Sequence, residues 1–252
     1  MITEEYSRFA GLNFQRFREL AATPGISQYE KIGFPNAFRE GKEPGIFADI
    51  LRKLINLTKT SRVVLDIGPG CSDLPRLLHQ HCRQQRHTLL LADSPEMLQL
   101  LPDSADIRKY PGRFPHDCGP LLIEYAGRID AIVSYSVLQY AFTDGGVFSF
   151  LDSALGLLAE GGEMLLGDIP NISKRRRFFS SAAGIRSHHE FTGAKEDPQV
   201  VFNQPEPGNI DDSVILALLA RARAAGFDAY VVPQDSQLPM ANRREDILIR
   251  RP

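Results

Sequence analysis

Apolar positions along this chain follow two alternating patterns, short continuous runs and stripes with helical spacing. Residues 63–65 and 89–92 are continuously apolar, which is typical of parallel strands buried on both faces. Between these runs, Leu74, Leu77 and Leu78 recur on one face of a helix. A strand, a helix and a second strand in this order form a βαβ unit, so the pattern predicts an α/β protein built on a parallel sheet.

The alternation continues after these two strands. Residues 128–135 form a third buried run that opens into a turn. Residues 157–168 predict a helix end, a reversal at Gly161 and Gly162, and then another strand, because a glycine pair supplies both a helix C-cap and an easy turn.

The last third of the chain begins with a segment that we expect to be irregular. Residues 171–209 contain prolines and are too long for an ordinary loop, so we interpret them as an insertion. A helix is expected over 211–226, and strands over 228–232 and 246–249 complete the pattern.

Helices are predicted before the first strand. One is expected from Thr3 to about Leu20, followed by a break at 22–25, where proline and glycine meet. We therefore divide the chain into an amino-terminal helical segment, residues 1–43, and a main domain, residues 44–252.

The first strand ends in an acid and opens into a glycine turn, Asp66-Ile67-Gly68-Pro69-Gly70. Glycines at a strand–helix junction let a ligand approach bare backbone. A dinucleotide fingerprint would need a third glycine where Asp73 stands, and a phosphate-binding P-loop would need a lysine that is absent. By itself, this turn fits a cofactor site and a structural junction equally well.

A second acid, Asp93, ends the next strand. A carboxylate at the tip of that strand can accept hydrogen bonds from both hydroxyls of a ribose. The sequence continues through Ser94 and Met97 into a helix, where Met97 fits a contact with a ligand or a place in the core.

Together these elements resemble the class I S-adenosylmethionine (SAM)-dependent methyltransferases. The resemblance covers the turn at 66–70, the acid Asp93, the strands over 128–135 and 163–168, and the final hairpin. It implies a Rossmann-like, doubly wound seven-stranded sheet of order 3-2-1-4-5-7-6 with strand 7 antiparallel. It also implies that the segment before the sheet covers the cofactor.

The resemblance assigns a cofactor-binding set to this chain. Asp66, Gly68 and Gly70 would hold the methionine end of SAM, and Asp93 its ribose. The full set is Asp66, Gly68, Gly70, Asp93, Ser94, Met97 and Ser134. One position departs from the family, because Arg113 stands where an acid often contacts the adenine amino group.

Methyl transfer to a hydroxyl or an amine requires alignment with the methyl group and removal of a proton. Gln139 and Asp168, which follow the fourth and fifth strands, are predicted to bind the acceptor, and Tyr140 is predicted to be catalytic. His188 and His189 are the predicted bases, since imidazole titrates near neutrality. Solvated loop histidines are one alternative, and a divalent metal held together with Glu190 is another, although we predict no metal site.

The densest basic run is Lys174-Arg175-Arg176-Arg177. Arginine is shaped to bind phosphate or carboxylate, so Arg175 and Arg177 are predicted to contact an anionic acceptor. A solvated face is the alternative.

Composition narrows the range of partners. The 252 residues carry a formal net charge of −2, which gives no long-range attraction to nucleic acid or to an anionic membrane. The three cysteines, Cys71, Cys82 and Cys118, lack metal-ligand spacing and indicate free thiols in a cytoplasmic protein. We expect no signal peptide and no membrane span.

The predicted function is methyl transfer from SAM to a small-molecule or glycan-type acceptor. The stretch from Gly167 to His189 resembles methyltransferases of bacterial surface-polysaccharide synthesis. Two alternatives remain open at this point. One is a non-catalytic partner subunit with the same fold, and the other is an NAD-dependent reductase.

Overall fold

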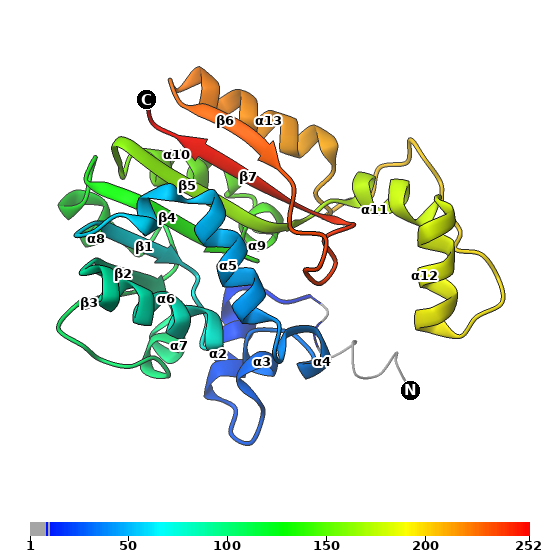
Figure 1. The fold of residues 1–252 in the computed structure, drawn as a ribbon, viewed down its shortest axis with the longest axis horizontal. Helices are drawn as coiled ribbons and strands as arrows, with labels where there is room; N and C mark the ends of the chain where they lie inside the picture. The colour runs from blue at the N-terminus through cyan, green and yellow to red at the C-terminus, as the bar shows by residue number, and fades with distance from the viewer. Residues whose placement is uncertain (1–8, 10) are drawn as a thin grey trace.

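The structure, a computed structural model, describes Phe9 and residues 11–252 (Figure 1). The helices are α2 (Phe14–Ala22), α3 (Gln28–Lys31), α4 (Asn36–Arg39), α5 (Glu43–Lys53), the 3-10 helix η1 (Ile55–Thr58), α6 (Asp73–Gln85), α7 (Pro95–Gln99), α8 (Gly119–Glu124), α9 (Leu138–Thr143), α10 (Val147–Leu155), α11 (Ile172–Phe179), α12 (Ala182–Thr192) and α13 (Asp212–Ala224). The strands are β1 (Val63–Ile67), β2 (Thr88–Asp93), β3 (Ile107–Pro111), β4 (Ile129–Tyr135), β5 (Leu158–Pro170), β6 (Asp228–Val232) and β7 (Arg244–Arg250).

All seven strands form one sheet of order β3-β2-β1-β4-β5-β7-β6. The pairs among β1 to β5 are parallel, whereas β7 runs antiparallel to both β5 and β6. The fold class and strand order predicted from the sequence are therefore confirmed.

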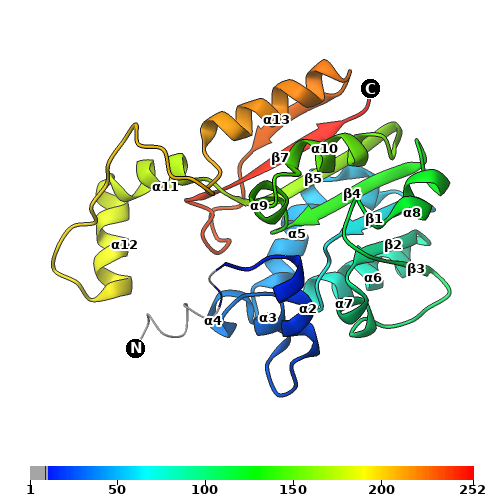
Figure 2. The same ribbon diagram turned by 180° about the vertical axis from the view of Figure 1, so that it is seen from behind.

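Helices cover both faces of the sheet. Alternate strand residues point to opposite faces, and because both sets are apolar, each face has to be buried under a helix layer. Val64 packs with α5 and α6 on one face, and Leu65 packs with α10 and α13 on the other. Figure 1 shows the first helix layer in front of the sheet, and Figure 2 shows the second layer from behind. Both strand residues are fully buried, which is why the sequence reads as a continuous apolar run.

The helices α2, α3 and α4 form a cover beside the carboxyl ends of β1 and β2. Lys31 closes the carboxyl end of α2 by donating to the carbonyl oxygens of Ala21 and Thr23, both at 2.6 Å. The cover is attached to the main domain by Arg18, which is paired with Glu96 of α7 at 2.7 Å. We will call residues 14–39 the cover.

The predicted helix from Thr3 to about Leu20 needs correction. Residues 1–8 and 10 lie outside the described residues, and α2 begins only at Phe14. Asn13 caps it by accepting a hydrogen bond from the Arg16 amide at 3.0 Å, so the helix has a defined start after a non-helical stretch.

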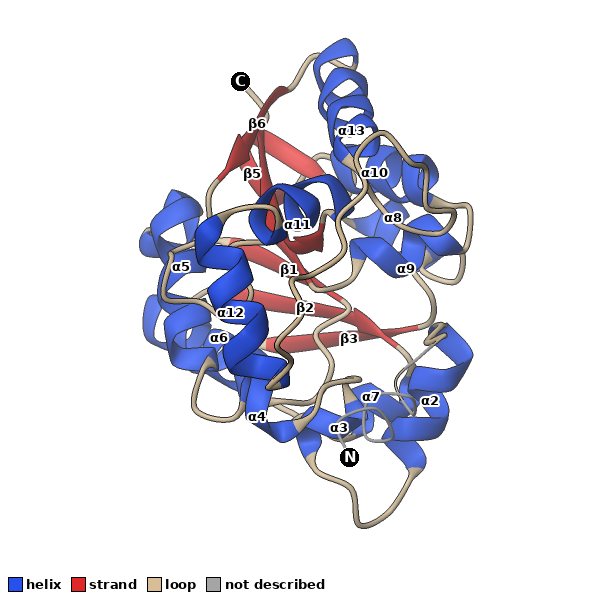
Figure 3. Cartoon of the chain, turned by 90° about the vertical axis from the view of Figure 1, so that its right-hand side faces the viewer, coloured by secondary structure: helices blue, strands red, loops and turns tan. Residues whose placement is uncertain are grey.

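The predicted irregular segment over 171–209 is also partly wrong. Its first half folds into α11 and α12, each opened by a side-chain cap from Asn171 or Ser181. This pair of helices, which we will call the arm, extends from the end of β5 away from the sheet (Figure 1), so that α12 lies in front of the strands when the molecule is viewed from that side (Figure 3). Residues 194–210 contain no helix or strand.

The glycine pair at Gly161 and Gly162 does not make the expected turn before the strand. It lies inside β5, where the pairing with β4 shifts register between Ile129 and Ala131. The pair therefore marks a bulge, and α10 has already ended at Leu155. No helix among the described residues is long and apolar enough to span a bilayer.

Candidate functional site

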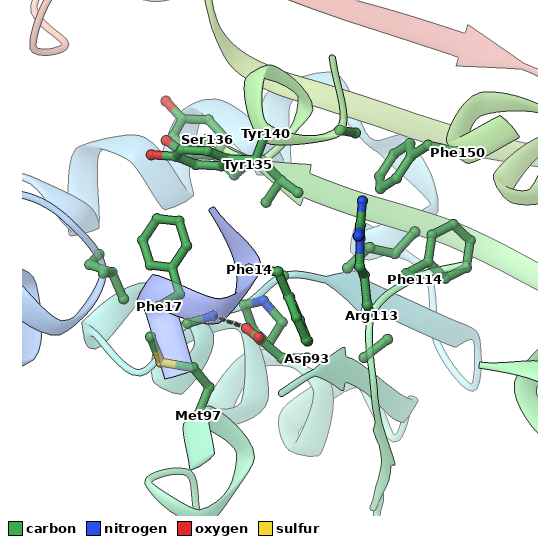
Figure 4. A pocket seen from close by; sticks show the side chains of 18 of the residues that line it. Phe14, Phe17, Asp93, Met97, Arg113, Phe114, Tyr135, Ser136, Tyr140 and Phe150 are labelled. Atoms are coloured by element: carbon green, nitrogen blue, oxygen red, sulfur yellow. Dashed lines mark hydrogen bonds between the residues drawn. The ribbon is translucent and has the colours of Figure 1, made fainter. Parts of the chain in front are cut away.

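A pocket lies at the carboxyl ends of β1, β2 and β4, between the sheet and the cover (Figure 4). It encloses about 1080 Å³ when the part open to solvent is counted. This is the edge where open parallel sheets bind their ligands. Residues central to its lining are Phe14, Phe17, Ile32, Arg39, Glu43, Gly68, Gly70, Asp93, Met97, Arg113, His116, Ser136 and Tyr140.

The glycine turn forms the floor of this pocket. Gly68 and Gly70 have φ angles of +73° and +65°, a region that favours glycine. A β-carbon added at Gly68 would lie 2.6 Å from Val137, and one at Gly70 would lie 2.5 Å from Ile32. Glycine is therefore required by the backbone conformation and by neighbours from two other segments.

Asp93 is fixed against this turn. Its Oδ2 accepts a hydrogen bond from the Gly70 amide at 3.0 Å, and its Oδ1 accepts one from the Ser94 amide at 2.6 Å. Burial raises the pKa of Asp93 to about 6, against the lowering effect of these two bonds. The carboxylate keeps free lone pairs on both oxygens and can accept further donors from a ligand.

Met97 also lines the pocket, as the predicted cofactor set requires. Ser94 is buried and is used within the chain, where its hydroxyl caps α7 by accepting from the Met97 amide at 3.2 Å. Ser134 is buried as well and donates to the carbonyl of Ile67 at 3.2 Å. The two serines position the strand ends and are not part of the lining.

Asp66 lies behind the turn rather than in the lining. It is 4 % exposed, and burial together with the nearby Asp93 raises its pKa to about 8. No hydrogen bond to its carboxyl group is found among the described residues. A neutral acid therefore stands beneath the glycine turn at pH 7.

Arg113 occupies the pocket wall after β3, where the family pattern suggested an acid. Its guanidinium is paired with Asp144 at 2.9 Å, and the next residue, Phe114, packs edge-on against Phe150. Figure 4 shows Arg113 and Phe114 on the same side of the pocket as Asp93. This part of the wall offers a flat guanidinium and apolar ring edges.

Tyr140 stands at the opposite end of the pocket. Its ring meets Phe17 of the cover edge-on, with centroids 4.8 Å apart. Burial raises the pKa of Tyr140, so its hydroxyl stays protonated at neutral pH and can donate a hydrogen bond. Gln139 is not in the lining, because its amide donates to the carbonyl of Ser136 at 2.8 Å.

A buried polar cluster joins the cover to the strand ends. Arg39 is paired with Asp168 at 2.9 Å and donates to the Ser136 hydroxyl at 2.5 Å, and that hydroxyl in turn donates to Asp168. Asp168 and Ser136 have φ angles of +57° and +62°, a strained conformation that tends to occur at functional sites. Asp168 is thus covered by Arg39 and Ser136, which face the pocket.

The predicted bases lie elsewhere. His188 and His189 are on α12 of the arm, where His189 approaches Asp197 at 3.2 Å. Their rings are 6.0 Å apart, and His188 lies edge-on to Phe179. Neither is part of the pocket lining, so the structure does not bring them together with Tyr140.

The two predicted anion-binding arginines differ in their surroundings. Arg177 is paired with Asp212 of α13 at 2.5 Å. Arg175 lies over the ring of Phe179, and no carboxylate is paired with it among the described residues. Arg243, just before β7, approaches the same ring at 5.0 Å, and burial, followed by the charge of Arg175, lowers its pKa.

Sequence reasoning missed many of the lining residues, among them the polar side chains of Arg39, Glu43, His116 and Ser136. The first two belong to short helices before the sheet, and no motif marks them. His116 follows β3 and is itself exposed, between the buried Pro115 and Cys118, in a loop without helical or strand periodicity. Ser136 lies in the turn after the fourth strand, close in sequence to the predicted residues Gln139 and Tyr140, and that position could have marked it as a site residue.

No known protein-family model matches the chain, and no curated protein does. Solved structures do resemble it. The N-methyltransferase NodS from Bradyrhizobium japonicum, with bound S-adenosylhomocysteine, aligns over 95% of this chain and 98% of its own, at a TM-score of 0.54 and 14% identity.

Two further solved structures align over nearly all of this chain. The plantazolicin methyltransferase BpumL, in complex with S-adenosylhomocysteine and a monoazolic desmethylPZN analogue, aligns over 100% of it and 99% of its own chain, at a TM-score of 0.55 and 15% identity. The CurJ carbon methyltransferase aligns over 99% of this chain and 69% of its own, at 0.56 and 14%. The three differ in acceptor and share the architecture, so the chain has the fold of the class I SAM-dependent methyltransferases.

Proposed function

We propose that this protein is a SAM-dependent methyltransferase acting on a small-molecule or glycan-type hydroxyl or amine. The observation that carries the proposal is the junction of the Gly68–Gly70 turn with Asp93 through a 3.0 Å hydrogen bond, at the floor of an open pocket. SAM would supply an activated methyl group, and S-adenosylhomocysteine is found in neighbours of this fold.

The pocket residues fit this cofactor. Gly68 and Gly70 leave bare backbone for its methionine end, and the free lone pairs of Asp93 suit the two hydroxyls of a ribose. Met97 and the wall at Arg113 and Phe114 offer surfaces on which a planar base can pack.

The other end of the pocket would orient the acceptor. Tyr140 and Ser136 line it with hydroxyls, and Arg39 adds a guanidinium. Tyr140 stays protonated and so would donate a hydrogen bond to the acceptor rather than remove its proton. For proton removal, His189 remains our sequence-based prediction, which requires the arm to close over the pocket, while His116 already lies in the lining.

Calorimetry with S-adenosylhomocysteine tests the cofactor assignment. Two hydrogen bonds to a charged group contribute on the order of 1.5–3 kcal/mol each, so Asp93→Ala is expected to weaken binding at least about tenfold. Asp103→Ala is the matched control, because Asp103 has a side chain 93% exposed and lies outside the pocket. NAD should not bind.

Label transfer from methyl-labelled SAM to a panel of sugar nucleotides, amino sugars and small amines tests the reaction. Binding of S-adenosylhomocysteine without transfer to any acceptor would favour the non-catalytic subunit. Binding of NAD in its place would favour the reductase and contradict the proposal.

A further inference from the structure

Glu43 is the first residue of α5 and one of the most deeply buried acids in the molecule. It is 1% exposed and lines the pocket beside Gly70 and Ser72. Its Oε2 accepts a hydrogen bond from the Leu74 amide at 2.6 Å. Its other oxygen, Oε1, is buried and has no hydrogen-bond partner within the part of the chain that the structure describes.

An orphaned carboxylate oxygen at the wall of a ligand pocket calls for an explanation, since leaving such an atom unpaired costs free energy. The Oε2 bond to Leu74 explains why the side chain is held there, because the amino end of α6 favours an acid. It leaves Oε1 free for a donor that arrives with a ligand.

The charges around Glu43 favour a cationic donor. Asp93 lies beside the same turn, Asp73 is close enough to act on Glu43, and burial raises the pKa of both Glu43 and Asp93. The two arginines in the lining are already engaged, Arg39 by Asp168 and Arg113 by Asp144. Arg39 also lowers the pKa of Glu43 from a distance, but no cation is paired with the Glu43 carboxyl group among the described residues.

We propose that Glu43 binds the α-ammonium group of the cofactor's amino-acid end through Oε1. This inference rests on the proposed function, which places that end of SAM over the Gly68–Gly70 turn, next to Glu43. An ammonium has three donors and a full positive charge, so it would satisfy the orphaned oxygen and offset the local acids.

The test compares three ligands that differ at the amino-acid end. S-adenosylhomocysteine carries both the ammonium and the carboxylate, 5′-S-(3-carboxypropyl)-5′-thioadenosine lacks only the amino group, and 5′-methylthioadenosine lacks the whole end. In wild-type protein we expect calorimetry to show at least tenfold weaker binding for the analogue without the amino group. Glu43→Gln should weaken S-adenosylhomocysteine at least tenfold and leave both other ligands within about twofold.

Asp49→Asn is the matched control. Asp49 is a buried acid on the same helix, but it is paired with Lys53 at 2.5 Å and does not line the pocket. This variant should leave the ratio between the three affinities unchanged.

The outcomes separate the inference from the function on which it rests. If none of the three ligands binds wild-type protein, the proposed function fails. If S-adenosylhomocysteine binds but wild-type protein does not distinguish it from the analogue without the amino group, Glu43 does not hold the ammonium. That comparison needs no variant, so it stands even if Glu43→Gln is unstable.

Discussion

Ile32 of the cover occupies the space that a side chain at Gly70 would need. Its Cγ2 atom would lie 2.5 Å from an added β-carbon, and Gly70 also has a φ of +65°. A side chain there is thus opposed by backbone strain and by a contact within the protein, before any ligand binds. The glycine is therefore needed for the fold itself, in addition to the role in cofactor binding that we propose for it.

Gly70→Val is expected to abolish S-adenosylhomocysteine binding and also to lower the thermal midpoint. Left-handed backbone costs about 1–2 kcal/mol for a residue with a β-carbon, and the Ile32 contact adds to it. Gly145→Val is the control, since Gly145 has a φ of +76° and open space around it. Equal midpoints for the two variants, measured by thermal unfolding, would mean that Ile32 moves aside freely.

The buried pair of Arg39 and Asp168 makes a second prediction at this scale. Asp168→Asn leaves Arg39 buried beside a neutral partner, and breaking such a pair costs about 3–5 kcal/mol. Asp152→Asn breaks the exposed pair with Arg221 and should cost less than about 1 kcal/mol. Urea unfolding measures both, and similar losses would show that burial does not strengthen the first pair.

At the scale of elements, the arm is where sequence reasoning failed most clearly. The helices α11 and α12 bury few of their residues, so they lack the apolar stripe by which a helix is detected. Their caps at Asn171 and Ser181 are visible in the sequence but are weak signals without that stripe. The strands, in contrast, were found because their apolar runs are buried on both faces.

The arm also contains the anion site that we predict for the acceptor. Arg175→Gln should raise the acceptor's KM and leave S-adenosylhomocysteine affinity unchanged, because Arg175 lacks a carboxylate partner among the described residues. Arg186→Gln, exposed on α12, is the control. Steady-state kinetics at rising salt should show a KM that climbs in wild-type protein and in Arg186→Gln but stays nearly constant in Arg175→Gln. A KM equal in all three proteins would identify Arg175 as a solvated side chain.

Over the whole molecule, the sheet order was predictable and the pocket walls were not. Each parallel strand is followed directly in the sequence by a turn and a helix, so a local pattern reveals every strand–turn–helix unit. The glycine turn and Asp93 each lie at the strand end of one such unit, which is why they could be predicted. Arg39 and Asp168 are 129 residues apart, and Glu43 reaches the turn from before the first strand. Nothing local in the sequence marks contacts of this kind, which depend on how the cover closes.

The pH dependence of stability is a property of the whole molecule. The pKa of Asp66 is raised from 3.8 to about 8 in the folded protein, so its contribution is present in full below pH 3.8 and is lost as pH rises through about 8. Relative to Asp66→Asn, wild-type protein should lose up to about 1.4 kcal/mol per pH unit between the unfolded value of 3.8 and about 8, and the loss should level off above pH 8. Urea unfolding between pH 6 and 9 measures this, and parallel profiles would contradict it.

Under the proposed function, the same carboxyl group would couple proton release to cofactor binding. At pH 7 the acid beneath the glycine turn still holds its proton. A cationic ligand above it stabilises the ionised form, so each binding event would discharge up to about one proton into solution. A higher pH would then raise the apparent affinity for the cofactor, just as a higher cofactor concentration raises the bound fraction. At a more alkaline pH the protein would therefore be saturated by less cofactor.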